Sequence, residues 1–204
     1  NVTDVDRNDK PIVYIMDRPG SQQSIIFAGH VVPKRSSDDE VAIESFQNIF
    51  GGTFTSRINM NLREDKHWSY GSFSILWGAK GQRPFFVYAP VQTDKTKESM
   101  TEILTEMTNI KNEKPDTDDE FMKDKNSRTL SLPGSWETAG SVSGSLSEMI
   151  TYNLPDDYFV KFPQMVNSLS KDQVNNSSQK LLHPDNLVWV VVGDKEKIEA
   201  GIKE

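Results

Sequence analysis

The apolar run at residues 187–192 (LVWVVV) constrains the fold more than any other feature, because it follows a long helical part of the chain. Its continuous β-branched and aromatic character is typical of a central strand that is covered on both faces. The turn composition of residues 183–186 (HPDN) directly precedes it. We therefore predict that this last strand returns to a sheet built by the first half of the chain.

Short runs rich in β-branched and aromatic residues predict the other strands of that sheet. They lie at residues 12–16, 24–32, 69–79 and 83–92. The first two runs are separated by a turn composition at 17–21 (DRPGS), and the last two predict a hairpin around 79–82 (AKGQ). Pro90 cannot donate a hydrogen bond to a neighbouring strand, so we expect it at an edge or an end.

Two helices are predicted between these strand pairs, because apolar residues recur there at helical spacing. The apolar face of the first consists of Ala42, Phe46, Ile49 and Phe50. The glycine pair at 51–52 ends this helix. The second helix is expected over 54–66, with Phe54, Ile58 and Leu62 on one face.

The second half of the chain is predicted to be helical up to the last strand. A long helix runs from Asp94 to near Lys114, and further helical segments are 117–130, 135–152 and 156–169. The apolar face of segment 135–152 is formed by Val142, Leu146, Met149 and Ile150. Residues 170–173 (SKDQ) have the spacing of a capping box and predict the start of one more short helix.

This order of elements predicts an α+β fold, with a largely antiparallel sheet of about five to six strands packed on one side by several helices. No internal repeat or Pro/Gly/Ser linker interrupts the order, so we expect residues 1–204 to form a single domain. The sequence starts at Asn1 without the features of a signal peptide, which we interpret as a fragment or one half of a larger protein.

Composition and motifs exclude several classes of function. With 30 acidic and 23 basic residues and a net charge of −7, the chain would repel nucleic acid. It has no cysteine, which excludes disulfides and thiolate chemistry, and its apolar runs are far shorter than the ~20 residues of a membrane span. His30, His67 and His183 are scattered and begin no zinc-binding pattern. Nucleophile elbows and phosphate-binding loops are also missing from the sequence.

Arg63 and Tyr70, in the stretch 51–71, are the candidate site residues. Arginine supplies fixed charged donors and tyrosine a directional hydroxyl, which together suit a peptide carbonyl or a developing oxyanion. A structural alternative is open as well: Arg63 pairs with Glu64 or Asp65, and Tyr70 begins a strand. Spacing by itself favours the structural alternative, because surface ion pairs and strand tyrosines are common.

The same stretch resembles a known family. Residues 51–57 (GGTFTSR), 61–64 (NLRE) and 70–71 (YG) are similar to the second-half signature of the insulinase-like (pitrilysin, inverzincin) zinc metallopeptidases. Further similarity lies at 23–24 (QS), 91–96 (VQTDKT), 184–187 (PDNL) and 193–194 (GD), so the resemblance covers nearly the whole chain. One departure is 67–69 (HWS), where relatives have a small glycine-containing turn, and it leaves the direction of Tyr70 open.

The resemblance implies a division of labour between two halves of an endopeptidase. A partner half, on the same or a separate chain, would carry zinc on a His-x-x-Glu-His motif and a distal glutamate. This half would have no cofactor or metal site of its own, and Arg63 and Tyr70 would bind the carbonyl of a peptide substrate. The isolated domain is then expected to be inactive, and family habit suggests the bacterial periplasm or cell envelope.

Two other functions are compatible with the same residues. In the first, the chain is an inactive structural or peptide-binding subunit of an assembly that resembles a processing peptidase. In the second, it is an unrelated α+β binding domain, since a fold does not fix a function. An Arg63/Tyr70 pair favours the peptidase, because a pure scaffold has no need of it.

Overall fold

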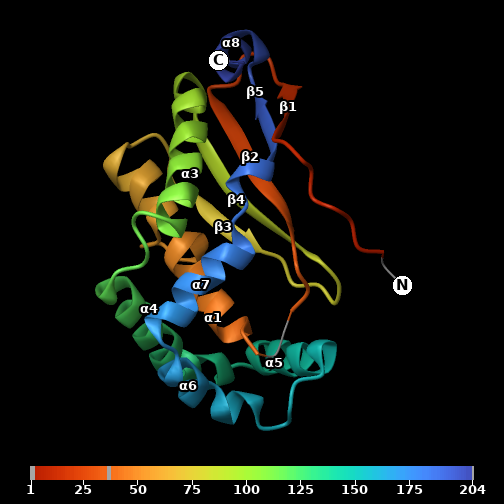
Figure 1. Cartoon of the computed structure of the whole chain (residues 1–204), viewed down its shortest axis with the longest axis vertical. Helices are drawn as coiled ribbons and strands as arrows, with labels where there is room; N and C mark the ends of the chain where they lie inside the picture. The colour runs from red at the N-terminus through yellow and green to blue at the C-terminus, as the bar shows by residue number, and fades with distance from the viewer. Residues whose placement is uncertain (1–2, 36–37, 204) are drawn as a thin grey trace.

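Five strands form one mixed sheet in the order β1-β5-β2-β4-β3 (Figure 1). The computed structural model describes residues 3–35 and 38–203. The strands are β1 (Ile12–Asp17), β2 (Gln23–Val32), β3 (Phe73–Leu76), β4 (Arg83–Gln92) and β5 (Val188–Gly193). β1 and β5 are parallel, whereas the other neighbours are antiparallel. The predicted fold class, a largely antiparallel sheet with helices, is confirmed.

The last strand, β5, does return to the sheet of the first half and separates β1 from β2. The expectation that both of its faces are covered is wrong. Trp189 and Val191 are buried, but Val188, Val190 and Val192 on the other face are only half-buried. A sheet with helices on one side leaves alternate residues partly exposed, even in a strand whose sequence is continuously apolar.

The helices pack mainly against one side of the sheet, and Figure 1 shows α1, α3 and α7 together beside the strands. The α-helices are α1 (Glu40–Gln47), α2 (Arg57–Asn59), α3 (Thr96–Lys111), α4 (Asp118–Leu130), α5 (Ala139–Tyr152), α6 (Tyr158–Ser168), α7 (Lys171–Leu181) and α8 (Lys195–Ile202). The predicted capping box is confirmed at the start of α7, where the Ser170 and Gln173 side chains each bond the other's backbone amide. Helix α8 was not predicted. No described helix is long and apolar enough to span a bilayer.

The hydrophobic core lies between this face of the sheet and α1 and α3. Ile26 and Ala28 of β2 face Phe46 of α1 and Ile103 of α3 in one continuous cluster in which all four are 0% exposed. Burying a side chain of the size of Ile103 contributes about 1.5–3 kcal/mol. The core therefore fixes the two strands, β2 and β4, whose ends carry the candidate site.

The glycine pair ends the first helix through close packing. α1 continues as a π-helical segment, Asn48–Gly52, and stops at Thr53 as predicted. A Cβ atom on Gly51 would lie 2.5 Å from the backbone nitrogen of Ser74 in β3. The segment thus needs glycine because the next strand touches its backbone, and this contact sets where the following motif begins.

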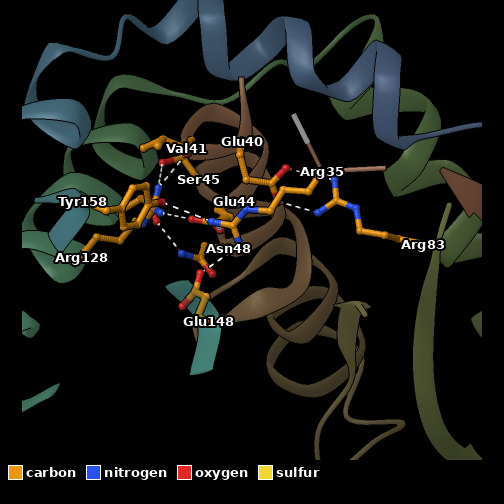
Figure 2. Close-up of polar contacts among 11 residues, drawn as sticks. Arg35, Glu40, Val41, Glu44, Ser45, Asn48, Arg83, Arg128, Glu148 and Tyr158 are labelled. Atoms are coloured by element: carbon orange, nitrogen blue, oxygen red, sulfur yellow. Dashed lines mark hydrogen bonds and ion pairs between the residues drawn. The ribbon is translucent and has the colours of Figure 1, made fainter. Parts of the chain in front are cut away.

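A polar network joins several of the helices (Figure 2). The Glu44 carboxylate lies between Arg128 of α4, at 2.5 Å, and Arg35, at 3.6 Å. Arg35 also pairs with Glu148 of α5 at 2.9 Å and donates to the Tyr158 hydroxyl of α6 at 3.3 Å. Four helices are therefore connected through two guanidinium groups.

Helix α5 is held by polar contacts instead of the predicted apolar face. None of its residues is buried, and Leu146 and Ile150 are 50% and 80% exposed. Its inner side makes the Glu148 ion pair, and the Tyr152 ring lies 4.6 Å from the Arg35 guanidinium carbon. The prediction that Leu146 and Ile150 pack inward is wrong, because the helix is attached by its charged and aromatic residues.

Candidate functional site

Arg63 and Tyr70 line the same open hollow, which has a volume of about 340 Å³. The hollow lies where β2 begins and β4 ends. Its lining consists of Gln23, Arg63, Glu64, His67, Trp68, Ser69, Tyr70 and Gln92. Gln23 and Gln92 are directly opposite each other across the two strands. The structure thus brings the two predicted residues together with two side-chain amides.

Arg63 is presented by a π-helical segment, Met60–Asp65, that follows the short helix α2. The predicted helix over 54–66 is therefore too long at its start, and Phe54 is not in the core but 56% exposed. The Phe54 ring instead lies under the Arg63 guanidinium, 4.4 Å from its central carbon. Such a cation–π contact holds a guanidinium flat and leaves its edge free to donate hydrogen bonds.

The ion pair between Arg63 and Glu64 is present, as the structural alternative predicted. Arg63 Nη1 lies 2.7 Å from Glu64 Oε1, and the two side chains are 33% and 43% exposed. An exposed pair of this kind contributes about 0–1 kcal/mol. Loss of this pair would therefore cost the fold little.

Tyr70 does not begin a strand. The predicted strand over 69–79 is shortened to Phe73–Leu76, and Ser69 makes an isolated bridge to Val91. The amides of Trp68 and Ser69 both donate to the Leu62 carbonyl, which turns the chain before β3 starts. Tyr70 is 89% exposed in the resulting loop, and its hydroxyl bonds none of the described residues. Its donor is free for a ligand.

His67 explains the departure at 67–69 from the family pattern. Its φ angle is +59°, in the left-handed region that glycine adopts without strain. The ring Nδ1 lies 3.1 Å from the Arg63 carbonyl oxygen, and the His67 carbonyl accepts from Gln92 Nε2 at 3.2 Å. At this turn the chain therefore carries a histidine that also contacts the Arg63 segment.

Sequence reasoning missed Phe54, Gln23 and Gln92 as parts of the site. Phe54 had been assigned to the core because it fits the helical spacing of Ile58 and Leu62. The two glutamines carried one usable signal, since Gln23 directly precedes a predicted strand and Gln92 ends one. Both side chains lie on the opposite face from the buried residues. Their pairing depends on the strand register, which the sequence did not give.

The described residues do not fit a zinc ion. No group of three or more His, Asp or Glu side chains is placed to hold a metal among them. The fold does bring His30 and His183 together, with ring centroids 5.1 Å apart, but the His183 amide donates to His30 Nε2 at 2.9 Å. Burial, followed by the positive charges of His183 and Arg7, lowers the pKa of His30 to about 4. The pair is a packed contact within the fold.

Comparison with known families identifies the chain. The family described as "Peptidase M16 inactive domain" matches residues 2–127, which include the whole hollow. Because this match covers more than half of the chain, the chain belongs to the family of peptidase M16 inactive domains. The family resemblance seen in the sequence is therefore confirmed.

Solved structures share the fold. The peptidase M16 inactive domain from Pseudomonas fluorescens is 22% identical with a TM-score of 0.82, and the alignment covers 94% of this chain and 45% of that one. A protease from Helicobacter pylori is 16% identical with a TM-score of 0.81, over 92% of this chain and 45% of that one.

A third structure is the ferredoxin protease FusC in complex with Arabidopsis ferredoxin. It is 13% identical with a TM-score of 0.67, and the alignment covers 90% of this chain and 20% of that one. The chain thus spans less than half the length of these three structures. A comparison with curated proteins gives no match.

Proposed function

We propose that this chain is the non-catalytic, substrate-binding half of a zinc-dependent endopeptidase, in which Arg63 and Tyr70 hold a carbonyl of the peptide. One observation carries the proposal: Arg63 and Tyr70 line the same hollow. Membership of the M16 family supports it, as does the relative of similar fold that holds ferredoxin.

The chemistry of the pair fits a role in binding without proton transfer. Arginine stays charged at every physiological pH, and a tyrosine hydroxyl donates directionally. Hydrogen bonds from both to a carbonyl oxygen would position the peptide and become stronger as negative charge develops there. Gln23 and Gln92 would add amide contacts to the neighbouring peptide backbone. We assign zinc to the partner half, where it would supply the activated water.

The helix-free face of the sheet is where we place the partner half. Phe27 of β2 and Phe86 of β4 face that side with ring centroids 6.0 Å apart, and nearby Trp77 is 64% exposed. These side chains line an apolar cavity of about 530 Å³. Gln23 and Gln92 point to the same face as these phenylalanines, because Gln23 and Phe27 lie an even number of positions apart on β2, as do Phe86 and Gln92 on β4. A partner bound there would stand beside the hollow.

Two substitutions in the assembled enzyme test the proposal. Arg63→Ala and Tyr70→Phe should each lower peptide turnover by about 10²–10³-fold, the usual cost of one donor to a developing oxyanion. Arg18→Ala is a matched control, because Arg18 is exposed outside the hollow. Thermal unfolding of all three variants should stay close to that of the wild type. Normal turnover by both hollow variants would reject the assigned role.

A second candidate is an inactive scaffold or peptide-binding subunit. The Arg63–Glu64 ion pair favours it, because this contact occupies the guanidinium without any ligand. The two candidates differ in the partner half. A His-x-x-Glu-His motif with a later glutamate in the partner, together with zinc-dependent cleavage by the assembly, supports the endopeptidase. A partner lacking that motif, and an assembly that binds peptides without cleaving them, supports the scaffold.

A further inference from the structure

One buried side-chain amide connects the segment that supports Arg63 with the loop that carries Tyr70. Asn59, at the end of α2, is 0% exposed. Its Nδ2 donates to the Phe54 carbonyl at 2.6 Å, and its Oδ1 accepts from the Ser72 amide at 3.0 Å. These two bonds end on either side of the motif, one before Arg63 and one after Tyr70.

The bond to Phe54 fixes the support of the guanidinium. The Phe54 ring is the surface on which Arg63 lies, and it is more than half exposed, so core packing does not hold it in place. Its backbone is restrained by Asn59 instead. Loss of that bond would let the ring, and the guanidinium with it, move relative to the rest of the hollow.

The bond to Ser72 fixes the loop that carries the phenol. Ser72 Oγ donates to Ser69 Oγ at 3.0 Å, and the Gly71 amide donates to the same oxygen at 3.1 Å. Ser69 Oγ in turn donates to the Pro90 carbonyl of β4 at 2.6 Å. Tyr70 thus lies between Ser69 and Gly71, which are both bonded within this serine cluster. Asn59 anchors the cluster through its bond to the Ser72 amide.

We propose that Asn59 is the positioning residue of the site, which sets the separation between Arg63 and Tyr70 so that both donors reach one carbonyl oxygen. This inference rests on the proposed function. Asn59 does not touch the substrate. It acts through the Phe54 and Ser72 backbones, and a group with both an amide donor and a carbonyl acceptor is required to bond the two together.

A double-mutant cycle in the assembled enzyme tests the inference. Asn59→Ala should lower kcat by about 10–100-fold, because misplacement of a catalytic geometry by ~1 Å is costly. In the Tyr70→Phe background the same substitution should cost less than about 3-fold, since the separation between the two donors no longer matters once one of them is gone. The loss of thermal stability should be equal in both backgrounds. Full additivity of the two losses in kcat would overturn the inference.

A second variant and a second measurement do not depend on turnover. Asn59→Asp keeps the acceptor for Ser72 and removes the donor to Phe54, so it should disturb Arg63 more than Tyr70. In this chain, amide hydrogen exchange measured by NMR should rise at Gly71 as well as Ser72 in Asn59→Ala, and stay unchanged at Gln92, which bonds Trp68. Unchanged exchange at Gly71 would overturn the positioning role.

Failure of the proposed function gives a different pattern. Tyr70→Phe would then cleave at the wild-type rate, while exchange at Gly71 would still rise in Asn59→Ala. That result would reject the function and confirm the link between Asn59 and the loop.

Discussion

Arg57 and Arg63 belong to the same short motif, yet the structure uses them in opposite ways. Arg57 binds Glu120 of α4 through two bonds of 2.6 and 2.7 Å and donates to the carbonyls of Lys114 and Pro115. Arg63 pairs with its neighbour Glu64 and lies on Phe54. The first guanidinium uses its donors within the fold, whereas the second uses only Nη1, on Glu64, among the described residues. In this motif, the number of engaged donors distinguishes the structural arginine from the one that we propose binds the peptide.

The largest effect on stability should come from Arg57. Arg57→Ala leaves the Glu120 carboxylate without its partner and frees the loop after α3, so the free energy of unfolding should fall by about 2–4 kcal/mol. Arg57→Lys keeps the charge and loses the two-pronged bond, so it should recover part of this loss. Arg63→Ala should change the free energy of unfolding by less than about 0.5 kcal/mol. Urea unfolding of the three variants measures this, and equal losses for Arg57→Ala and Arg63→Ala would contradict the comparison.

Asp116 should show a smaller, pH-dependent effect near Arg57. It is 2% exposed, and neither carboxylate oxygen has a partner among the described residues. Burial raises its pKa from 3.8 to about 6. The folded state therefore binds a proton more tightly than the unfolded one, and this destabilisation is present above pH 6 and disappears as the pH falls towards 4.

Asp116→Asn should raise the free energy of unfolding at pH 7.5 by about 1–2 kcal/mol. The gain should shrink through the window from pH 6 to pH 4, because the wild-type carboxyl becomes neutral there. Chemical unfolding of Asp116→Asn and the wild type across this pH range measures the gain. Asp118→Asn is the matched control, since Asp118 is 87% exposed in its salt bridge with Lys171. A gain that stays constant from pH 7.5 to pH 4 would refute this account of Asp116.

His67→Gly should stabilise the turn next to Arg63 by up to about 1 kcal/mol, because glycine adopts a φ of +59° without strain. The gain is limited by the loss of the ring contact to the Arg63 carbonyl. Thermal unfolding compares His67→Gly with His67→Ala, which should gain nothing because alanine is also strained there. Equal stability of the two variants would show that backbone strain is absent.

The smallest effect should come from Glu64. Glu64→Gln removes the ion pair that competes for Arg63, so the assembled enzyme should bind a substrate peptide about 2–5-fold more tightly at low salt. The gain should fade at high salt, where the wild-type pair is already screened. Fluorescence anisotropy of a labelled peptide measures it. Weaker binding by Glu64→Gln would mean that Glu64 itself contacts the peptide.

Local patterns predicted most elements of the fold. β4 spans the predicted 83–92, α4 (Asp118–Leu130) lies within the predicted segment 117–130, and α7 begins at the predicted capping box. The failures have a common cause, which is that an apolar residue at helical or strand spacing has several possible partners. Phe54 covers an arginine, and Leu146 and Ile150 face outward because α5 is held by Arg35. The spacing of apolar residues predicts a helix or a strand, but it does not identify the residues that pack against it.

The sequence by itself determined the periodicity of the elements, the lack of cysteine and the spacing of Arg63 and Tyr70 within a family motif. Only the tertiary structure decided which arginine of that motif is occupied. Arg57 is satisfied by Glu120, which lies 63 residues further along the chain. Whether a donor is free depends on groups brought close by the packing of α3 and α4, and such long-range contacts leave no local pattern in the sequence.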